Sequence, residues 1–119
     1  MLIDLARFLA VIAALEGGPC PPTAYGPYGI SPGVLADVNA RRGWAYTVRD
    51  LADPAVSAQV AGEHVRWLSS RIRAHAQAVT VVNLAACWRS GVRGWLAGKG
   101  RTYGGRAETL YHDPEDHWQ

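Results

Sequence analysis

The chain lacks the features that mark several classes of protein. Its 119 residues contain two cysteines, Cys20 and Cys87, and neither belongs to a CxxC pair or to a set with zinc-ligand spacing. No apolar run reaches the ~20 residues that a membrane-spanning helix needs. No alternating strand pattern extends beyond a few residues, and no segment repeats. These absences argue against a zinc module, a membrane span and a β-sheet fold.

The chain also carries little net charge, only +2, so its overall electrostatic field indicates no particular partner. With 49% hydrophobic and 18% charged residues, the composition is that of a folded domain. A chain of this length can bury a core without metals or disulfides, and no cofactor or metal is expected. The two cysteines fit either one disulfide or two buried thiols.

The N-terminal apolar run, residues 2–15, does not resemble a secretory signal peptide. It contains Asp4, and its only cation, Arg7, lies inside the apolar part. We therefore expect a protein that is made in the cytoplasm and spans no membrane.

Apolar spacing and capping residues predict an all-α, single-domain fold. Ser31-Pro32 and Asp53-Pro54 are typical helix starts, and Thr47 and Asp50 form a capping-box pattern that opens a short turn. The first helix is apolar on nearly every side, so we expect it to be central and buried. A short hairpin is allowed in the Gly- and Pro-rich loop 17–31. Expected helices cover 2–16, 32–42, a long segment from 54, 80–90 with interruptions at Gly91 and Gly94, and 102–111.

Glu16 ends the first apolar run and is followed by Gly17-Gly18-Pro19, through which a helix does not easily continue. A helix C-terminus and apolar neighbours both raise the pKa of a carboxyl group. A carboxylic acid that stays protonated near neutral pH suits general acid catalysis. From the residues alone, an ordinary helix-terminal surface glutamate is the competing interpretation.

Three segments in order resemble the goose-type lysozyme and lytic transglycosylase superfamily, in its small phage-type branch. Residues 14–18 are similar to the family's Glu-Ser-Gly motif, 24–31 to its Gly-x-x-Gln-Ile segment, and 85–91 to its Ala-x-x-aromatic-Asn-x-Gly helix. Tyr103, followed by Arg106-Ala107, resembles the family's closing tyrosine. The resemblance implies a lysozyme-like domain over residues 1–111, followed by an acidic tail over 112–119.

This resemblance implies a peptidoglycan glycosidase that cleaves the β-1,4 bond between N-acetylmuramic acid and N-acetylglucosamine. Glu16 is then the catalytic acid that later acts as base, giving either a hydrolysed or an anhydro product. No obvious second catalytic carboxylate is present, although Asp37, Asp50 and Asp53 are available, and the family often uses the substrate's acetamido group instead. The implied substrate-binding residues are Tyr25, Tyr28, Gly29, Ile30, Trp88, Arg89 and Tyr103. Loop packing of the first two and core packing of Trp88 are the alternatives.

The chain departs from the family pattern at Gly17, Gly29 and Arg89, where the family has Ser, Gln and Asn. Gly29 leaves space beside Tyr28, and Arg89 can reach across it to a lactyl or peptide carboxylate of the substrate. The same departures support an alternative, in which a catalytically weak or inactive module binds the cell wall or serves in a virion.

The expected partner is the peptidoglycan glycan strand, together with phage virion or lysis proteins, and the site of action is the cell wall after release or within a virion. Residues 89–106 hold five cations and no acid, which would suit nucleic acid, but they match no nucleic-acid module. His64 and His75 are eleven residues apart, so structural roles are expected. For His112, Asp113, Asp116 and His117 a solvated tail is preferred to a loose divalent-ion site. Cys20 and Cys87 are predicted to approach each other, because both flank the implied cleft.

Overall fold

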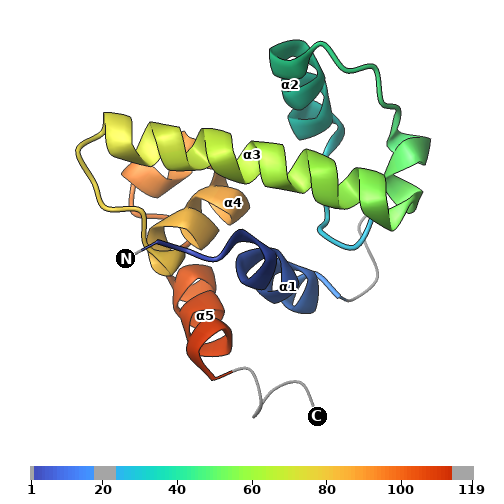
Figure 1. Cartoon of the computed structure of the whole chain (residues 1–119). Helices are drawn as coiled ribbons and strands as arrows, with labels where there is room; N and C mark the ends of the chain where they lie inside the picture. The colour runs from blue at the N-terminus through green and yellow to red at the C-terminus, as the bar shows by residue number, and fades with distance from the viewer. Residues whose placement is uncertain (1, 18–23, 114–119) are drawn as a thin grey trace.

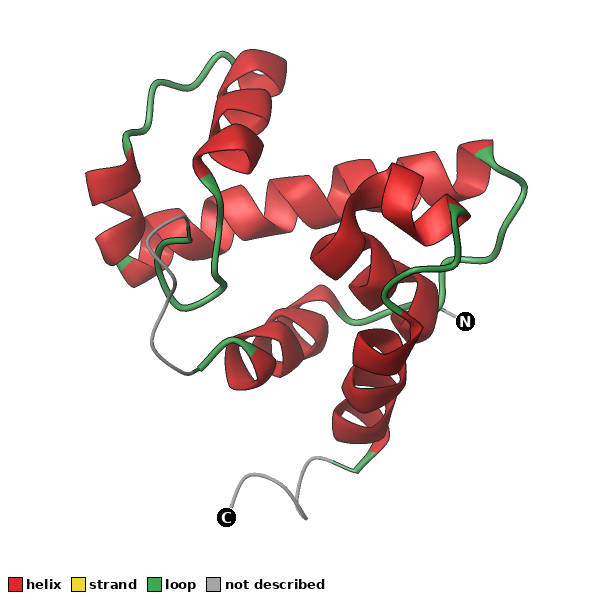
Figure 2. Cartoon of the chain, turned by 180° about the vertical axis from the view of Figure 1, so that it is seen from behind, coloured by secondary structure: helices red, strands yellow, loops and turns green. Residues whose placement is uncertain are grey.

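The computed structural model describes residues 2–17 and 24–113, and this part of the chain is all-α, as the sequence predicts (Figure 1). No strand occurs in it, and a single antiparallel bridge pairs Tyr25 with Ile30, so the allowed hairpin is reduced to one turn (Figure 2). The helices are α1 (Leu5–Leu15), α2 (Pro32–Arg42), the 3₁₀ helix η1 (Val48–Ala52), α3 (Pro54–Ala74), α4 (Val81–Leu96) and α5 (Arg101–His112).

The helix boundaries follow local capping chemistry. The Ser31 hydroxyl accepts a hydrogen bond from the Val34 amide, and Gly43 ends α2 in the left-handed conformation that glycine adopts easily. Asp53 accepts from the Ala55 amide at the start of α3. The predicted Thr47–Asp50 capping box is present at η1.

The long helix α3 runs across the molecule and packs against α1, α2, η1 and α4. Its buried apolar side chains Val60, Leu68 and Ile72 meet Phe8 and Ile12 of α1 in one core. A single hydrophobic core of this kind is what makes the described chain one domain. The predicted boundary between the domain and the 112–119 tail stays a prediction, because residues 114–119 lie outside the described part.

The first helix is less buried than its composition suggests. Phe8, Leu9, Val11 and Ile12 are buried on one face, whereas Ala6, Arg7 and Ala14 on the other side are exposed. Alanine is small and a good helix former, so exposing it is inexpensive. The helix therefore lies at the edge of the core, with Glu16 at its end.

Helices α4 and α5 approach each other most closely. A Cβ atom at Gly104 would lie 2.6 Å from the Val82 carbonyl oxygen, and one at Gly100 would lie 2.8 Å from the Ala86 carbonyl oxygen. Only glycine allows this approach of two backbones. Tyr103 lies between these two glycines in the sequence, so the close packing of α5 on α4 fixes its position along α4.

Gly91 breaks α4, as predicted, with φ 73° and ψ 168°, whereas Gly94 remains helical. The segment after the break turns away from the first part of α4 and leads into α5. In the described part of the chain, no helix is both long enough and apolar enough to cross a bilayer.

Candidate functional site

Glu16 caps the C-terminus of α1, and its backbone amide still donates to the Ile12 carbonyl at 2.9 Å. The Tyr103 hydroxyl donates to Glu16 Oε1 at 3.0 Å, across 87 positions of sequence. Arg89 Nη1 lies 3.9 Å from the same oxygen. The Glu16 side chain is 20% exposed, so it is largely buried but still reached by solvent.

Gly29 lies directly against the other oxygen of this carboxylate. The turn that carries it is closed by two 2.9 Å backbone hydrogen bonds between Tyr25 and Ile30. Gly29 has φ +64°, and a Cβ atom there would lie 3.2 Å from Glu16 Oε2. The missing side chain at this position therefore leaves space for the carboxylate.

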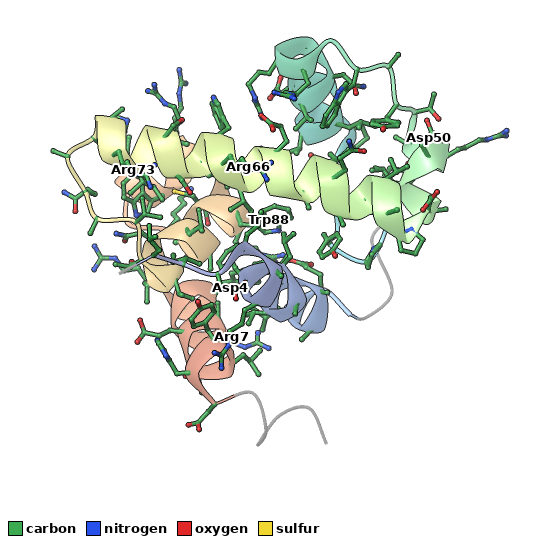
Figure 3. All side chains as sticks on the ribbon, viewed as in Figure 1. Asp4, Arg7, Asp50, Arg66, Arg73 and Trp88 are labelled. Atoms are coloured by element: carbon green, nitrogen blue, oxygen red, sulfur yellow. The ribbon has the colours of Figure 1, made fainter. Side chains whose placement is uncertain are left out.

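Glu16 borders a cavity of about 340 Å³ between the end of α1, the 24–31 loop, α3 and α4. Trp88 extends below the middle of α3 toward this region (Figure 3). The cavity is lined by Glu16, Ala24, Gly29, Ile30, Ser31, Val34, His64, Trp88 and Arg89.

The structure brings together most of the residues that the sequence nominates. Gly29, Ile30, Trp88 and Arg89 line the cavity with Glu16, and Tyr103 contacts its carboxylate. Ile30 is only 1% exposed, so its side chain belongs to the core.

Tyr25 and Tyr28 are not among the residues that line this cavity. Both are partly buried and pack against the core, in agreement with the loop-packing alternative.

Burial and the Glu16 carboxylate keep the Tyr103 hydroxyl protonated. Burial, the Glu16 charge and the Glu16 hydrogen bond all raise the pKa of Tyr103, so its hydroxyl acts as a donor. The Arg89 guanidinium lies over the Tyr103 ring at 5.7 Å and adds a positive charge beside the carboxylate.

The other carboxylates that the sequence offers have different positions. Asp50 belongs to the η1 capping box and Asp53 caps α3. Asp37 is exposed on α2 and lines a neighbouring groove. Glu16 is therefore the one carboxylate among the described residues that line its cavity.

His64 is a cavity residue that the sequence did not nominate. It is 8% exposed, and its ring is stacked 5.8 Å from Trp67 and lies edge-on 5.5 Å from Trp88. Burial lowers the pKa of His64 to about 4, with a further contribution from Arg41 and opposition from Asp37. Within the described part of the chain, its Nδ1 atom is buried without a hydrogen-bond partner. The apolar spacing of the α3 sequence includes His64, but it does not show that the Nδ1 atom lacks a hydrogen-bond partner.

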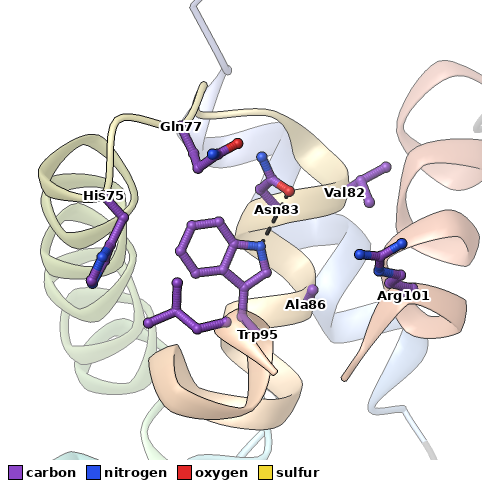
Figure 4. A pocket seen from close by; sticks show the side chains of 8 residues that line it. His75, Gln77, Val82, Asn83, Ala86, Trp95 and Arg101 are labelled. Atoms are coloured by element: carbon purple, nitrogen blue, oxygen red, sulfur yellow. Dashed lines mark hydrogen bonds between the residues drawn. The ribbon is translucent and has the colours of Figure 1, made fainter. Parts of the chain in front are cut away.

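A larger groove of about 780 Å³ continues from the Glu16 cavity, and the two share Val34, His64 and Trp88. It follows α3 and the second part of α4, where His75 and Leu96 also border a third cavity of about 520 Å³. Figure 4 shows this third cavity, in which the Trp95 indole donates to the Asn83 side chain at 3.2 Å. Neighbouring hollows along α4 therefore share lining residues.

The described residues contain no group of three or more His, Cys, Asp and Glu side chains that would hold a metal ion. Asp116 and His117 of the predicted tail lie outside the described residues. Cys20 does too, so its approach to Cys87 stays a prediction. Cys87 is buried beside the groove, and burial raises the pKa of its thiol to about 11, which makes it a poor nucleophile near neutral pH.

Comparison with protein-family models, curated proteins and solved structures finds no match to this chain.

Proposed function

We propose that this protein is a peptidoglycan glycosidase that cleaves the bond between N-acetylmuramic acid and N-acetylglucosamine, with Glu16 as the acid and then the base. The observation that carries the proposal is the 3.0 Å hydrogen bond from Tyr103 to Glu16 in a cavity that Gly29 and Trp88 also border. Residues from the separate segments of the resemblance thus meet at one carboxylate.

The contacts suggest how Arg89 can respond to a substrate. In the free protein the Tyr103 hydroxyl donates to Glu16, and the Arg89 guanidinium lies 3.9 Å from the same oxygen. Arg89 is 61% exposed and its ion pair is long, so a carboxylate on the substrate can attract the guanidinium away from Glu16. Entry of the sugar also excludes water from the cavity, where Glu16 must donate a proton to the glycosidic oxygen.

No second carboxylate is needed beside Glu16 if the substrate stabilises its own developing cation. The acetamido group of the sugar can supply that stabilisation, and Glu16 then activates a water or accepts the proton of the muramyl 6-hydroxyl. The choice between these two paths decides whether the product is hydrolysed or anhydro.

Mass spectrometry of purified sacculi digested with the protein tests this proposal. The wild type is expected to release muropeptides with a reducing or an anhydro muramyl end. Glu16→Gln, which keeps the shape but holds no catalytic proton, is expected to release at least ~10²-fold less. Glu108→Gln on the exposed face of α5 is the control and should match the wild type. Undiminished release by Glu16→Gln would show that another group is the acid.

A second candidate function is a wall-binding or virion module without activity. The observation that favours it is the Arg89–Glu16 ion pair, because the guanidinium stands beside the carboxylate that would have to act as the acid. This alternative predicts that the wild type sediments with insoluble peptidoglycan and releases no fragments from several wall types. Failure to sediment at all would count against both candidates.

A further inference from the structure

Two tryptophans line the groove of about 780 Å³ beside the Glu16 cavity. Trp67 and Trp88 are both partly exposed, and they flank His64 on two sides. The Arg41 guanidinium lies over the Trp67 ring at 4.6 Å and His64 is stacked against it, so the faces of Trp67 are occupied. Trp88 is the indole that offers an apolar face on which the C–H face of a sugar ring can pack. Because His64 and Trp88 also line the Glu16 cavity, the groove lies directly beside that cavity.

His64 supplies an unused polar group at the start of the groove. Its Nδ1 atom is buried and has no partner among the described residues, which is costly and calls for an explanation. At neutral pH the ring is uncharged, with one donor and one acceptor nitrogen. The tautomer that leaves an acceptor at Nδ1 is the less costly one, and it places an N–H donor at Nε2. That donor suits a hydroxyl or amide oxygen of a sugar.

Two arginines at the rim of the groove carry charges that the described protein does not neutralise. Arg71 on α3 and Arg93 on α4 both line the groove and are exposed, and neither forms an ion pair with an acid of the described chain. Arg42 and Arg66, in contrast, share Glu63. The one acid that lines the groove is Asp37, so its rim is positively charged.

We propose that this groove binds a peptide-bearing muramyl residue of the same strand, with its sugar against Trp88 and His64 and the carboxylates of its acidic peptide at Arg71 and Arg93. The inference rests on the proposed function, because the neighbouring sugars would occupy the Glu16 cavity. It makes the substrate a peptide-substituted strand rather than a bare glycan.

Binding of two soluble ligands tests the inference separately from catalysis. One is a tetrasaccharide of alternating N-acetylglucosamine and N-acetylmuramic acid with intact peptides, and the other is the same tetrasaccharide after an amidase has removed the peptides. Titration calorimetry with the full chain carrying Glu16→Gln, which removes the proposed acid so that neither ligand is cleaved, is expected to give about fivefold to tenfold tighter binding of the first ligand. This preference should fall as salt is added.

Variants show which residues bind the peptide of the ligand and which bind its sugar. Arg71→Gln/Arg93→Gln should abolish the preference for the peptide-bearing ligand and leave the stripped one unaffected. The matched control is Arg49→Gln/Arg73→Gln, which should keep the preference. Arg73 lies on the same helix as Arg71 (Figure 3) but does not line the groove. His64→Phe should weaken both ligands by the same factor, since His64 meets the sugar.

Three outcomes would overturn the inference: equal binding of the two ligands, a preference that survives Arg71→Gln/Arg93→Gln, or tighter binding of a single-stranded DNA oligomer than of the peptide-bearing ligand. Failure of the proposed function appears differently. In that case the preference persists, but sacculi are not cleaved.

Discussion

Glu16 and His64 border the same cavity, but the protein surrounds their polar atoms in opposite ways. Glu16 receives a hydrogen bond from Tyr103 and a cation from Arg89, which come from α5 and α4. His64 on α3 is enclosed by indole rings, and its Nδ1 has no partner among the described residues. One side of the cavity therefore places a hydrogen-bond donor and a cation beside a carboxylate, and the other side disfavours charge.

The largest expected effect concerns the excluded charge at His64. Its pKa is about 4 in the folded chain and 6.5 ordinarily, so between these values the unfolded chain binds a proton that the folded chain does not. The free energy of unfolding should consequently fall by about 3 kcal/mol as the pH drops through this interval. Urea unfolding at about pH 7 and about pH 4 measures the fall, and His64→Phe should lack this component. The same fall in both proteins would mean that His64 is readily protonated when folded.

The next effect concerns the hydrogen bond that Tyr103 donates to Glu16. Tyr103→Phe removes the hydroxyl donor, and a double-mutant cycle with Glu16→Gln should give a coupling free energy of about 1–2 kcal/mol in urea unfolding. The control cycle joins Tyr46 and Gln59, whose 2.9 Å hydrogen bond is exposed, and it should give less than about 0.5 kcal/mol. Equal couplings in the two cycles would remove the distinction between a cavity bond and a surface bond.

A smaller effect concerns the close approach of Gly29 to the Glu16 carboxylate. Gly29→Ala and Gly43→Ala both place an alanine at positive φ, which costs about 1 kcal/mol in each case. Gly29 has the additional close approach to Glu16 Oε2, whereas nothing lies within 4 Å of a Cβ at Gly43. Gly29→Ala should thus lower the free energy of unfolding by up to ~1 kcal/mol more than Gly43→Ala does. An identical cost for both would show that the carboxylate moves aside freely.

The smallest effect is expected at Arg89. The guanidinium is mostly exposed and 3.9 Å from the carboxylate, so Arg89→Gln should change the free energy of unfolding by less than about 0.5 kcal/mol. Urea unfolding at low and high salt checks this, because the small difference should vanish when salt screens the pair. A difference above ~1 kcal/mol that survives high salt would show that Arg89 is a rigid part of the site.

The sequence predicted the helices well because their ends depend on local chemistry. Ser31, Gly43, Asp53 and Gly91 each act on the backbone within a few residues, so their effects can be inferred without tertiary structure. The burial of α1 was overestimated, since apolar composition does not tell which alanines face the core.

The sequence nominated residues that lie close together in the structure, but it did not predict their contacts. The resemblance indicated Glu16, Gly29, Arg89 and Tyr103, yet the Arg89 guanidinium lies beside Glu16 itself instead of pointing only toward a ligand. His64 was missed because periodicity predicts which side chains face inward and says nothing about whether their polar atoms find partners. Such pairings depend on how elements far apart in sequence approach each other.

The break at Gly91 has a consequence for the spacing of positive charge. In an unbroken helix Arg89 and Arg93, four positions apart, would project from the same face one turn from each other. With φ 73° between them, Arg89 borders the Glu16 cavity and Arg93 borders the groove. Under the proposed function, the break in α4 sets the separation of these two guanidinium groups. That separation determines how far apart two negative groups on one strand must lie for both to be bound.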